Sequence, residues 1–218
     1  MKLSDNTLNI LVNFSKINTN IHVQPGNTLK TINSSETVFA VASVPEIFDS
    51  TFSFYELNRF LATHSLFDQP ELTFGDSSVL IESGKKSVKY TYSDPETLLY
   101  PKVDTIETKS STASFDLTKD QFVSVLKSSL VIGLSHVSFV GKNGKVSISS
   151  MKKNDPLSDS FTLDLDCACD KDFECVILIE RLESILPADY SISISDGLVH
   201  WSNKNINLQY WLASEIEN

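Results

Sequence analysis

The sequence predicts an α+β fold made of two similar domains, each a β-sheet with two amphipathic helices on one face. Three observations lead to this prediction: residues that recur at a fixed offset, hydroxyl-capped segments with helical periodicity, and alternating strands that close each half. The chain of 218 residues is long enough for two domains of roughly 110 residues.

The internal repeat is visible as matching residues in the same order along the two halves. His22 matches His136 at an offset of 136 − 22 = 114, and Leu57 matches Leu182 at 182 − 57 = 125. An insertion in the second half accounts for the change in offset. Ordered matches of this kind indicate that one unit has been duplicated.

The segment between the two copies is rich in Ser, Thr, Pro and charged residues, a composition typical of a linker. We therefore predict a first domain at residues 1–95, an interdomain linker at 96–112 and a second domain at 113–218.

Each copy is expected to open with a helix that begins after a hydroxyl residue. Ser4 precedes the first helix and Thr118 the second, and a hydroxyl at this position accepts hydrogen bonds from the exposed amides of the first turn. Apolar residues at a period of 3.6 give both helices a buried face. These residues are Leu3, Leu8, Ile10, Leu11, Phe14 and Ile17 in the first helix, and Phe122, Val123, Val125, Leu126 and Leu130 in the second.

Strands and a second helix follow in each copy. Asn143-Gly144 predicts a type I′ hairpin turn, with Gly26 opening a weaker counterpart in the first copy. Second helices are expected at 55–66 and at 180–186, the latter stopped by a proline. Three alternating strands then complete each domain.

Composition and motifs exclude several classes of function. The net charge of −10 disfavours an open-surface nucleic-acid binder. No apolar run is long enough to span a membrane, and residues 1–10 lack the apolar region of a signal peptide, so we expect neither membrane insertion nor export. Three cysteines without a framework spacing suit a reducing cytosol. Cys167, Cys169 and Cys175 lack a zinc-site pattern, and no nucleophile motif occurs. We expect no enzyme activity, metal or cofactor.

The polar faces of the helices are poor in carboxylates, although the chain is acidic. One explanation of these polar residues is an ordinary solvent-exposed helix face, and this alternative remains open. The functional interpretation is that carboxylates are kept away because phosphates approach. On that interpretation the DNA-facing side chains are Asn9, Asn13, Lys16, Arg59, Thr63, Lys119, Ser124, Lys127 and Arg181.

An ordered set of segments resembles the replicative sliding clamps of large tailed bacteriophages with T-even-like replisomes. Residues 1–4, 13–14, 17–18 and 21 resemble the opening of these clamps, residues 55–61 with 65–66 their second helix, and residues 89–95 the end of their first domain. The resemblance is dense over about the first 100 residues. Beyond them the internal repeat carries the prediction.

This resemblance implies a DNA polymerase processivity factor, a homotrimeric ring with subunits joined head to tail. The helices would line a hole around duplex DNA without reading its sequence. Enclosure would then replace adhesion, so few phosphate contacts are needed. The implied partners are the phage DNA polymerase, a clamp-loader ATPase and late transcription factors, in the host bacterial cytoplasm and without a membrane. The alternative is a non-enzymatic, β-rich structural or adaptor protein of a virion.

The resemblance also implies two further sites. Edge strands at 87–92 and 161–166 would form the subunit interface, through Tyr90, Tyr92, Phe161 and Leu163. A groove under the linker would bind the tails of partner proteins, and apolar anchors would carry most of that binding. Its residues are Leu98, Leu99, Tyr100, Pro101, Trp211 and Leu212. The open alternative is that these residues only pin the linker to the sheet.

Overall fold

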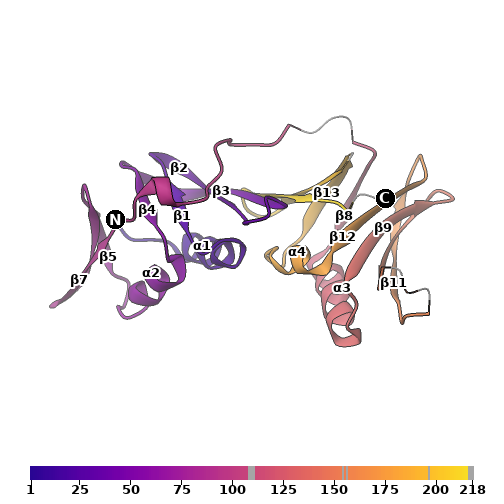
Figure 1. The fold of residues 1–218 in the computed structure, drawn as a ribbon, viewed down its shortest axis with the longest axis horizontal. Coiled ribbons are helices and arrows are strands. Elements are labelled where there is room, and N and C mark those ends of the chain that lie inside the picture. Colours follow the sequence, from indigo (N-terminus) through magenta and orange to yellow (C-terminus); the bar gives the residue numbers. More distant parts are fainter. Residues whose placement is uncertain (108–110, 154, 156, 196, 216–218) are drawn as a thin grey trace. The chain divides into compact units, whose positions relative to one another are not determined.

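The computed structural model describes residues 1–107, 111–153, 155, 157–195 and 197–215. The chain divides into two compact units, Met1–Thr105 and Ile106–Asn218 (Figure 1). The predicted linker at 96–112 spans this division, and its residues 108–110 lie outside the described residues, as do 216–218 of the predicted second domain.

The first unit contains two helices, α1 (Asp5–Ile17) and α2 (Leu57–His64), and a short 3-10 helix, η1 (Pro95–Thr97). Strand β1 pairs with β4, β2 pairs with β3, and β5-β6-β7 form a three-stranded antiparallel sheet with β7 at its edge. The strands are β1 (Ile21–Val23), β2 (Gly26–Ile32), β3 (Val38–Phe48), β4 (Phe52–Phe54), β5 (Glu71–Phe74), β6 (Ser78–Ser83) and β7 (Lys86–Thr91).

The second unit contains α3 (Lys119–Ile132) and α4 (Ile179–Glu183). One of its sheets has the order β11-β10-β9-β12, with β11 at an edge, and another antiparallel set runs β15-β14-β13-β8. The strands are β8 (Ala113–Leu117), β9 (His136–Lys142), β10 (Lys145–Met151), β11 (Phe161–Ala168), β12 (Phe173–Leu178), β13 (Tyr190–Ser195), β14 (Leu198–Asn203) and β15 (Leu208–Ala213).

The two units share one plan, as the internal repeat predicts. Strand β9 pairs with β12 as β1 pairs with β4. The amino end of the chain behaves like β8: the Met1 carbonyl accepts from the Leu72 amide at 2.7 Å, while Leu117 of β8 is paired with Tyr190 of β13. The repeat read from the sequence is therefore a repeat of structure.

Both opening helices begin where the sequence predicts. The Ser4 side chain caps α1 by accepting from the Thr7 amide, and the Thr118 side chain caps α3 by accepting from the Gln121 amide. Gln121 also accepts from the Thr118 amide at 2.9 Å, which completes a capping box. These caps satisfy donors that the first helical turn cannot pair within itself.

Each unit has its own aromatic core. In the first, Phe54 of β4 stacks on Phe60 of α2 with ring centroids 4.3 Å apart. In the second, the fully buried Trp201 lies 5.3 Å from Phe122 of α3 and 5.5 Å from Tyr190 of β13. These rings fix each pair of helices against strands of its own unit.

Three local predictions differ from the structure. The second helices are shorter than expected: residues 55–56, 65–66 and 184–186 lie outside the helical ranges. Gly26 (φ +123°) lies beside a β-bulge rather than in a tight hairpin turn. Leu130 is 49% exposed, since α3 buries Phe122, Val125 and Ser129 instead. The Asn143-Gly144 turn is confirmed, with both residues at positive φ.

Candidate nucleic-acid interface

Helix α1 presents Asn9 and Lys16 to solvent. Lys16 lies in the last turn, where the negative end of the helix dipole favours a cation. Asn13 is only 3% exposed, which corrects its predicted place on the DNA-facing surface. It follows Ile10 by three residues and precedes Ile17 by four, so helical geometry places it on the buried stripe with them.

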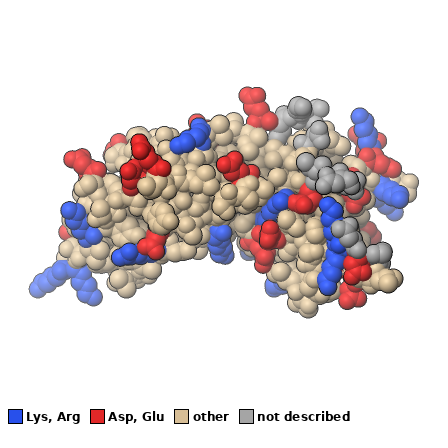
Figure 2. All heavy atoms as spheres, viewed as in Figure 1, with Lys and Arg blue, Asp and Glu red and all other residues tan. Residues whose placement is uncertain are grey.

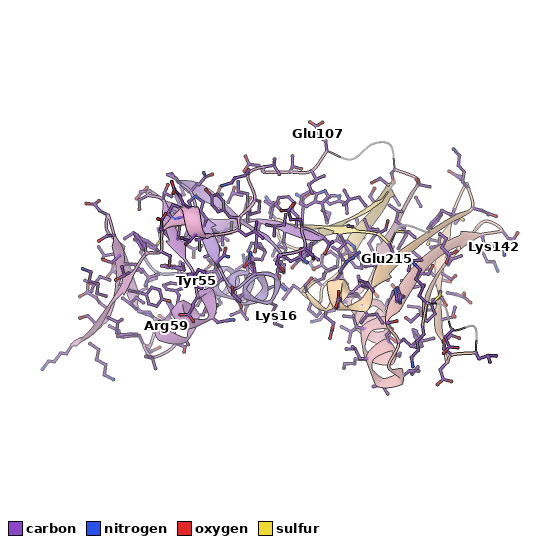
Figure 3. All side chains as sticks on the ribbon, in the orientation of Figure 1. Lys16, Tyr55, Arg59, Glu107, Lys142 and Glu215 are labelled. Carbon is purple, nitrogen blue, oxygen red and sulfur yellow. The ribbon has the colours of Figure 1, made fainter. Side chains whose placement is uncertain are left out.

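Helix α2 carries Arg59, which Figure 3 labels, and Thr63. The exposed Arg59 guanidinium pairs with Glu56 at 3.2 Å, and the Thr63 hydroxyl donates to the Arg59 carbonyl at 2.8 Å. An exposed pair at this spacing is worth little and is easily exchanged. The guanidinium group of Arg59 is therefore accessible to a phosphate.

Helix α3 presents Lys119, Ser124 and Lys127, all exposed. The backbone amide of Lys119 donates to the Asp189 carboxylate at 2.7 Å. This hydrogen bond does not involve the ammonium group of Lys119. The three side chains give α3 a polar surface with two cations.

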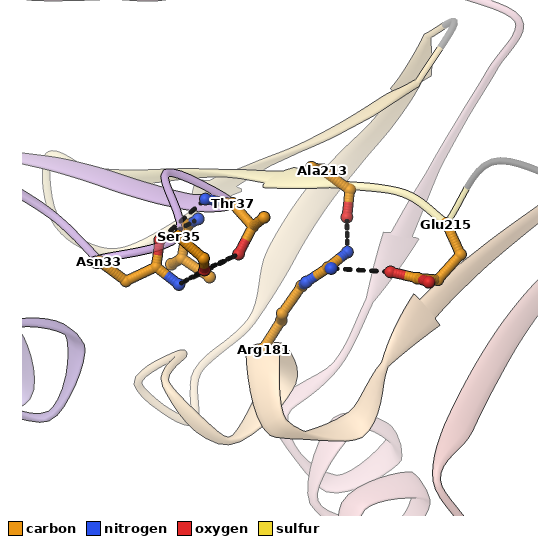
Figure 4. Close-up of polar contacts among 7 residues, drawn as sticks. Asn33, Ser35, Thr37, Arg181, Ala213 and Glu215 are labelled. Carbon is orange, nitrogen blue, oxygen red and sulfur yellow. Dashed lines mark hydrogen bonds and ion pairs between the residues drawn. The ribbon is translucent and has the colours of Figure 1, made fainter.

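Arg181 of α4 does not offer its charge to a ligand. One guanidinium nitrogen donates to the Ala213 carbonyl at 2.6 Å, and another pairs with the Glu215 carboxylate at 2.7 Å (Figure 4). The Arg181 side chain is 12% exposed. This corrects its predicted role: Arg181 ties α4 to the segment that follows β15.

The predicted interface residues lie on the two edge strands or beside them. Tyr90 of β7, Phe161 and Leu163 of β11, and Tyr92 directly after β7 are all half-buried. The Tyr90 ring lies 5.3 Å from Phe54, and its hydroxyl donates to the Glu56 carbonyl at 3.3 Å. Burial raises the pKa of both tyrosines.

The segment after η1 is fastened to the first unit. The Asn18 side chain donates to the Leu99 carbonyl at 3.2 Å, and Tyr100 lies on His22 with ring centroids 4.0 Å apart. Lys102 sits 3.4 Å from the centre of the Tyr100 ring, a cation–π contact. Burial, with the Lys102 and Lys30 cations, lowers the pKa of His22.

These contacts favour the alternative that part of the predicted groove only pins the linker to the first unit. Other residues of the predicted groove remain accessible to solvent. Pro101 is buried and Leu98 is half-buried, but Leu99 remains 37% exposed. Trp211 and Leu212 are 4% and 0% exposed, and consecutive strand residues point to opposite faces. Leu212 is therefore corrected to a core residue. Trp211 lies on the face of β15 opposite to Leu212, where its ring stacks on His200 with centroids 4.7 Å apart.

Sequence patterns missed several exposed apolar side chains, and two groups of them lie at helix ends. Val131 at the end of α3 is 87% exposed and Ile132 is 37% exposed. Tyr55, before α2, is 58% exposed. A signal was available for the first site, since three consecutive apolar residues at 130–132 cannot all lie on one helical stripe.

Over the described ranges, no cluster of three or more His, Cys, Asp or Glu side chains is placed to hold a metal ion. No helix in the same ranges is long and apolar enough to cross a membrane.

Comparison with known proteins shows what the chain is similar to. No family model matches the sequence. The chain is 27% identical to the sliding clamp of Vibrio phage KVP40 over 222 residues, which covers 99% of both chains. It is 26% identical to the sliding clamp of Enterobacteria phage T4 over 155 residues, covering 70% of this chain and 68% of that one. The chain is a homologue of the phage sliding clamps.

Solved structures show that this homologue has the DNA clamp fold. PCNA of A. fulgidus, solved with the C-terminal region of FEN-1, matches with a TM-score of 0.74 at 13% identity, covering 100% of this chain and 98% of that one. A putative DNA polymerase III β subunit from Eubacterium rectale matches with a TM-score of 0.75 at 12% identity, covering 100% and 64%. The predicted fold class and the predicted resemblance are both confirmed.

Proposed function

We propose that this chain is a DNA polymerase processivity factor, a sliding clamp without catalytic activity of its own. Its similarity to the KVP40 sliding clamp over 99% of both chains carries the proposal, and the clamp fold supports it. Three copies would join head to tail into a ring around duplex DNA in the host bacterial cytoplasm. The virion structural or adaptor alternative has no comparable support.

The charge distribution suits a ring that is held by topology rather than by adhesion. The chain carries a net charge of −10, so an open surface would repel DNA. The exposed cations Lys16, Arg59, Lys119 and Lys127 lie on helices together with neutral Asn9 and Ser124. Such a surface makes transient contacts to phosphates that do not depend on base sequence. Weak contacts of this kind permit movement along the duplex.

The partners of the clamp follow from the same role. The phage DNA polymerase would be tethered to DNA, a clamp-loader ATPase would open and close the ring, and late transcription factors would share the clamp. Leu99, exposed on the segment fastened to the first unit, is a candidate anchor for partner tails, with the half-buried Leu98 and Tyr100 beside it. Trp211 of the second unit is a separate candidate.

The direct test is the mass in solution together with polymerase stimulation. We expect a particle of about three times 24.3 kDa and longer primer-extension products when the clamp is loaded. A monomer at micromolar concentration, or a large open polymer, would contradict the ring.

The DNA-facing surface is tested by Lys16→Glu combined with Lys127→Glu. We expect slower loading onto DNA at low salt, because two cations become anions near phosphate. Arg181→Gln is the matched comparison, since Arg181 is bound to Glu215 and should not contact DNA. Unchanged loading by the double lysine variant would place these lysines elsewhere.

The partner surface is tested by Leu99→Ser, which removes an exposed apolar side chain without opening the core. We expect shorter primer-extension products with an unchanged trimer. Trp211→Ala should act in the same direction but also lower stability, because Trp211 is buried against His200. Full-length products with Leu99→Ser would remove Leu99 from the partner surface.

A further inference from the structure

Two of the edge strands, β7 and β11, carry opposite charges on their solvent-facing sides. Side chains alternate along a strand, so the solvent-facing side carries Ser87, Lys89 and Thr91 on β7, and Thr162, Asp164 and Asp166 on β11. Figure 2 shows Lys and Arg side chains gathered at the end of the first unit where β7 lies. An unpaired edge presents backbone donors and acceptors to another strand, so these charges determine which strand can approach.

The opposite faces of the same strands are apolar. Val88 and Tyr90 of β7 are half-buried, and the Tyr90 ring lies 5.6 Å from Phe60 of α2. On β11, Leu163 is half-buried and Leu165 is buried, on a strand that packs against α3. Each edge strand therefore has an apolar side toward the helices of its own unit and a charged side toward solvent.

The proposed clamp function implies that β7 of one copy pairs antiparallel with β11 of the next; we propose the register of this pair, in which Lys89 lies opposite Asp164. This inference rests on the proposed clamp function and adds the register and the charge pairing. In this register Thr91 faces Thr162 and Tyr90 faces Leu163, so apolar and polar sides both match. Directly opposed residues in an antiparallel pair share a face, where opposite charges attract and like charges repel.

A β-bulge in β11 selects this register over its neighbour. The pairing of β10 with β11 shifts between Lys145 and Val146, which leaves Asp166 and Cys167 of β11 in the irregular part. Shifting β7 by two residues would place Lys89 opposite Asp166, which lies in the irregular part of β11. A shift in the other direction sets Lys89 against Thr162 and loses the ion pair. Only the proposed register sets Lys89 against a carboxylate in regular strand.

Two exposed apolar sites support the antiparallel direction, one beside the carboxyl end of β7 and the other beside the amino end of β11. The Tyr55 amide donates to the Ser93 hydroxyl at 3.0 Å, so the exposed Tyr55 lies beside the carboxyl end of β7. On α3, the Ser129 hydroxyl donates to Ser150 at 2.7 Å, and Ser150 is paired with Phe161 at the amino end of β11. Antiparallel pairing brings these two ends together, and with them Tyr55 of one copy and the exposed end of α3 of the next.

The charges also exclude wrong pairings. Two β11 strands side by side would bring Asp164 and Asp166 of both copies together, and two β7 strands would bring Lys89 of both copies together. A basic edge that accepts only an acidic edge makes the contact directional. Directional contacts are what a head-to-tail ring needs in order to close.

The test exchanges the charges in the full-length chain. Lys89→Asp and Asp164→Lys alone should each raise the trimer dissociation constant by about tenfold or more, because attraction becomes repulsion. The double variant should restore it to near the unmodified value. Lys142→Asp, an equal charge change at the end of β9 (Figure 3), is the control and should leave it unchanged. Sedimentation velocity measures association, and circular dichroism verifies folding of each variant.

The outcomes separate this inference from the proposed function. An unmodified chain that stays monomeric would overturn both. A trimer in which the single variants behave like Lys142→Asp, or in which the double variant stays as weak as the single ones, would overturn the register while leaving the clamp intact.

A disulfide test measures the register independently. Thr91→Cys with Thr162→Cys places thiols directly opposite each other, within the distance that a disulfide spans. Mild oxidation of that variant should give covalent trimers. Ser87→Cys with Thr162→Cys is the matched control, because it keeps Lys89 and Asp164. This pair should not be cross-linked, since Ser87 lies opposite Asp166 in the proposed register. Preferential cross-linking of the control pair, or no cross-linking of either pair in a trimer, would overturn the proposed register.

Discussion

The helices α1 and α3 open the two units at equivalent positions, yet they end differently. Ile17 and Val131 correspond at an offset of 131 − 17 = 114. Ile17 is 8% exposed and Val131 is 87% exposed. The duplicated helix thus has an anchored end in one unit and a free apolar end in the other.

The cause is the residue that follows each helix. After α1, Asn18 is extended, and its side chain donates to the Ile32 and Leu99 carbonyls at 2.7 and 3.2 Å. After α3, Gly133 adopts a left-handed conformation (φ +74°), and the chain re-enters the core through Leu134. The comparison teaches that a repeat can preserve a helix while its terminus diverges to make a different surface.

The largest expected effect tests whether both helices hold their own core. Phe14→Ala in α1 and Phe122→Ala in α3 each remove a ring that is 0% or 1% exposed. Each should lower the free energy of unfolding by about 3–5 kcal/mol. Chemical denaturation at fixed protein concentration measures this loss. A loss below about 1 kcal/mol for either variant would show that its helix is not part of a packed core.

The helix caps should have the next largest effect. Thr118→Ala removes one side of the capping box and should lower the free energy of unfolding by about 1 kcal/mol. Ser4→Ala should lower the free energy of unfolding by less than Thr118→Ala does, because the Glu46 carboxylate also accepts from the Ser4 amide and from the Thr7 hydroxyl. An equal loss for both variants would mean that Glu46 does not support the start of α1.

A pH dependence should distinguish the two caps. Burial favours the neutral form of Glu46, but hydrogen bonds from Thr7 and Ser4 outweigh it and lower the pKa of this carboxyl. A carboxyl with a lowered pKa in the folded state stabilises the protein above its ordinary pKa, and this stability is lost as the pH falls through the folded value. Thermal unfolding between pH 7 and pH 3 should therefore show a smaller acid-induced loss in Glu46→Gln than in the unmodified chain.

A useful control for that experiment is Gln121→Ala, which removes the partner of Thr118 at the start of α3. Gln121 does not titrate, so this variant should lower stability equally across the pH range. A pH profile of Glu46→Gln that runs parallel to that of the unmodified chain would show that the Glu46 hydrogen bonds do not contribute to folding.

The smallest expected effect on folding is at the free end of α3. Val131→Ser should change the free energy of unfolding by less than about 0.5 kcal/mol, because an exposed side chain contributes little. Ile17→Ser, at the equivalent position in α1, should cost clearly more. Equal losses would contradict the difference in burial that separates the two helices.

Much of the fold could be predicted from the sequence because it rests on local physics. Hydroxyl caps at Ser4 and Thr118 and the positive φ of Asn143-Gly144 depend on residues a few positions apart. The ordered matches between the two halves predicted a duplicated unit, and the resemblance of segments such as residues 55–61 predicted the clamp family.

Side-chain exposure depended on tertiary packing, which the sequence did not determine. Asn13 appeared polar and therefore exposed, but it lies between Ile10 and Ile17 on the buried stripe. Arg181 appeared to be a free cation, but the strand that follows thirty residues later brings Ala213 and Glu215 to it. Leu130 has the period of a core residue, although Ser129 takes the buried place.

By itself, the sequence determined the duplicated α+β plan, the starts of both opening helices and the clamp family, since these follow from short-range preferences and ordered similarity. Tertiary structure alone decided which cations stay free, which apolar residues remain outside the core, and which side chains of β7 and β11 face solvent. The physical reason is that burial and pairing are properties of contacts between distant residues, and no local pattern specifies them.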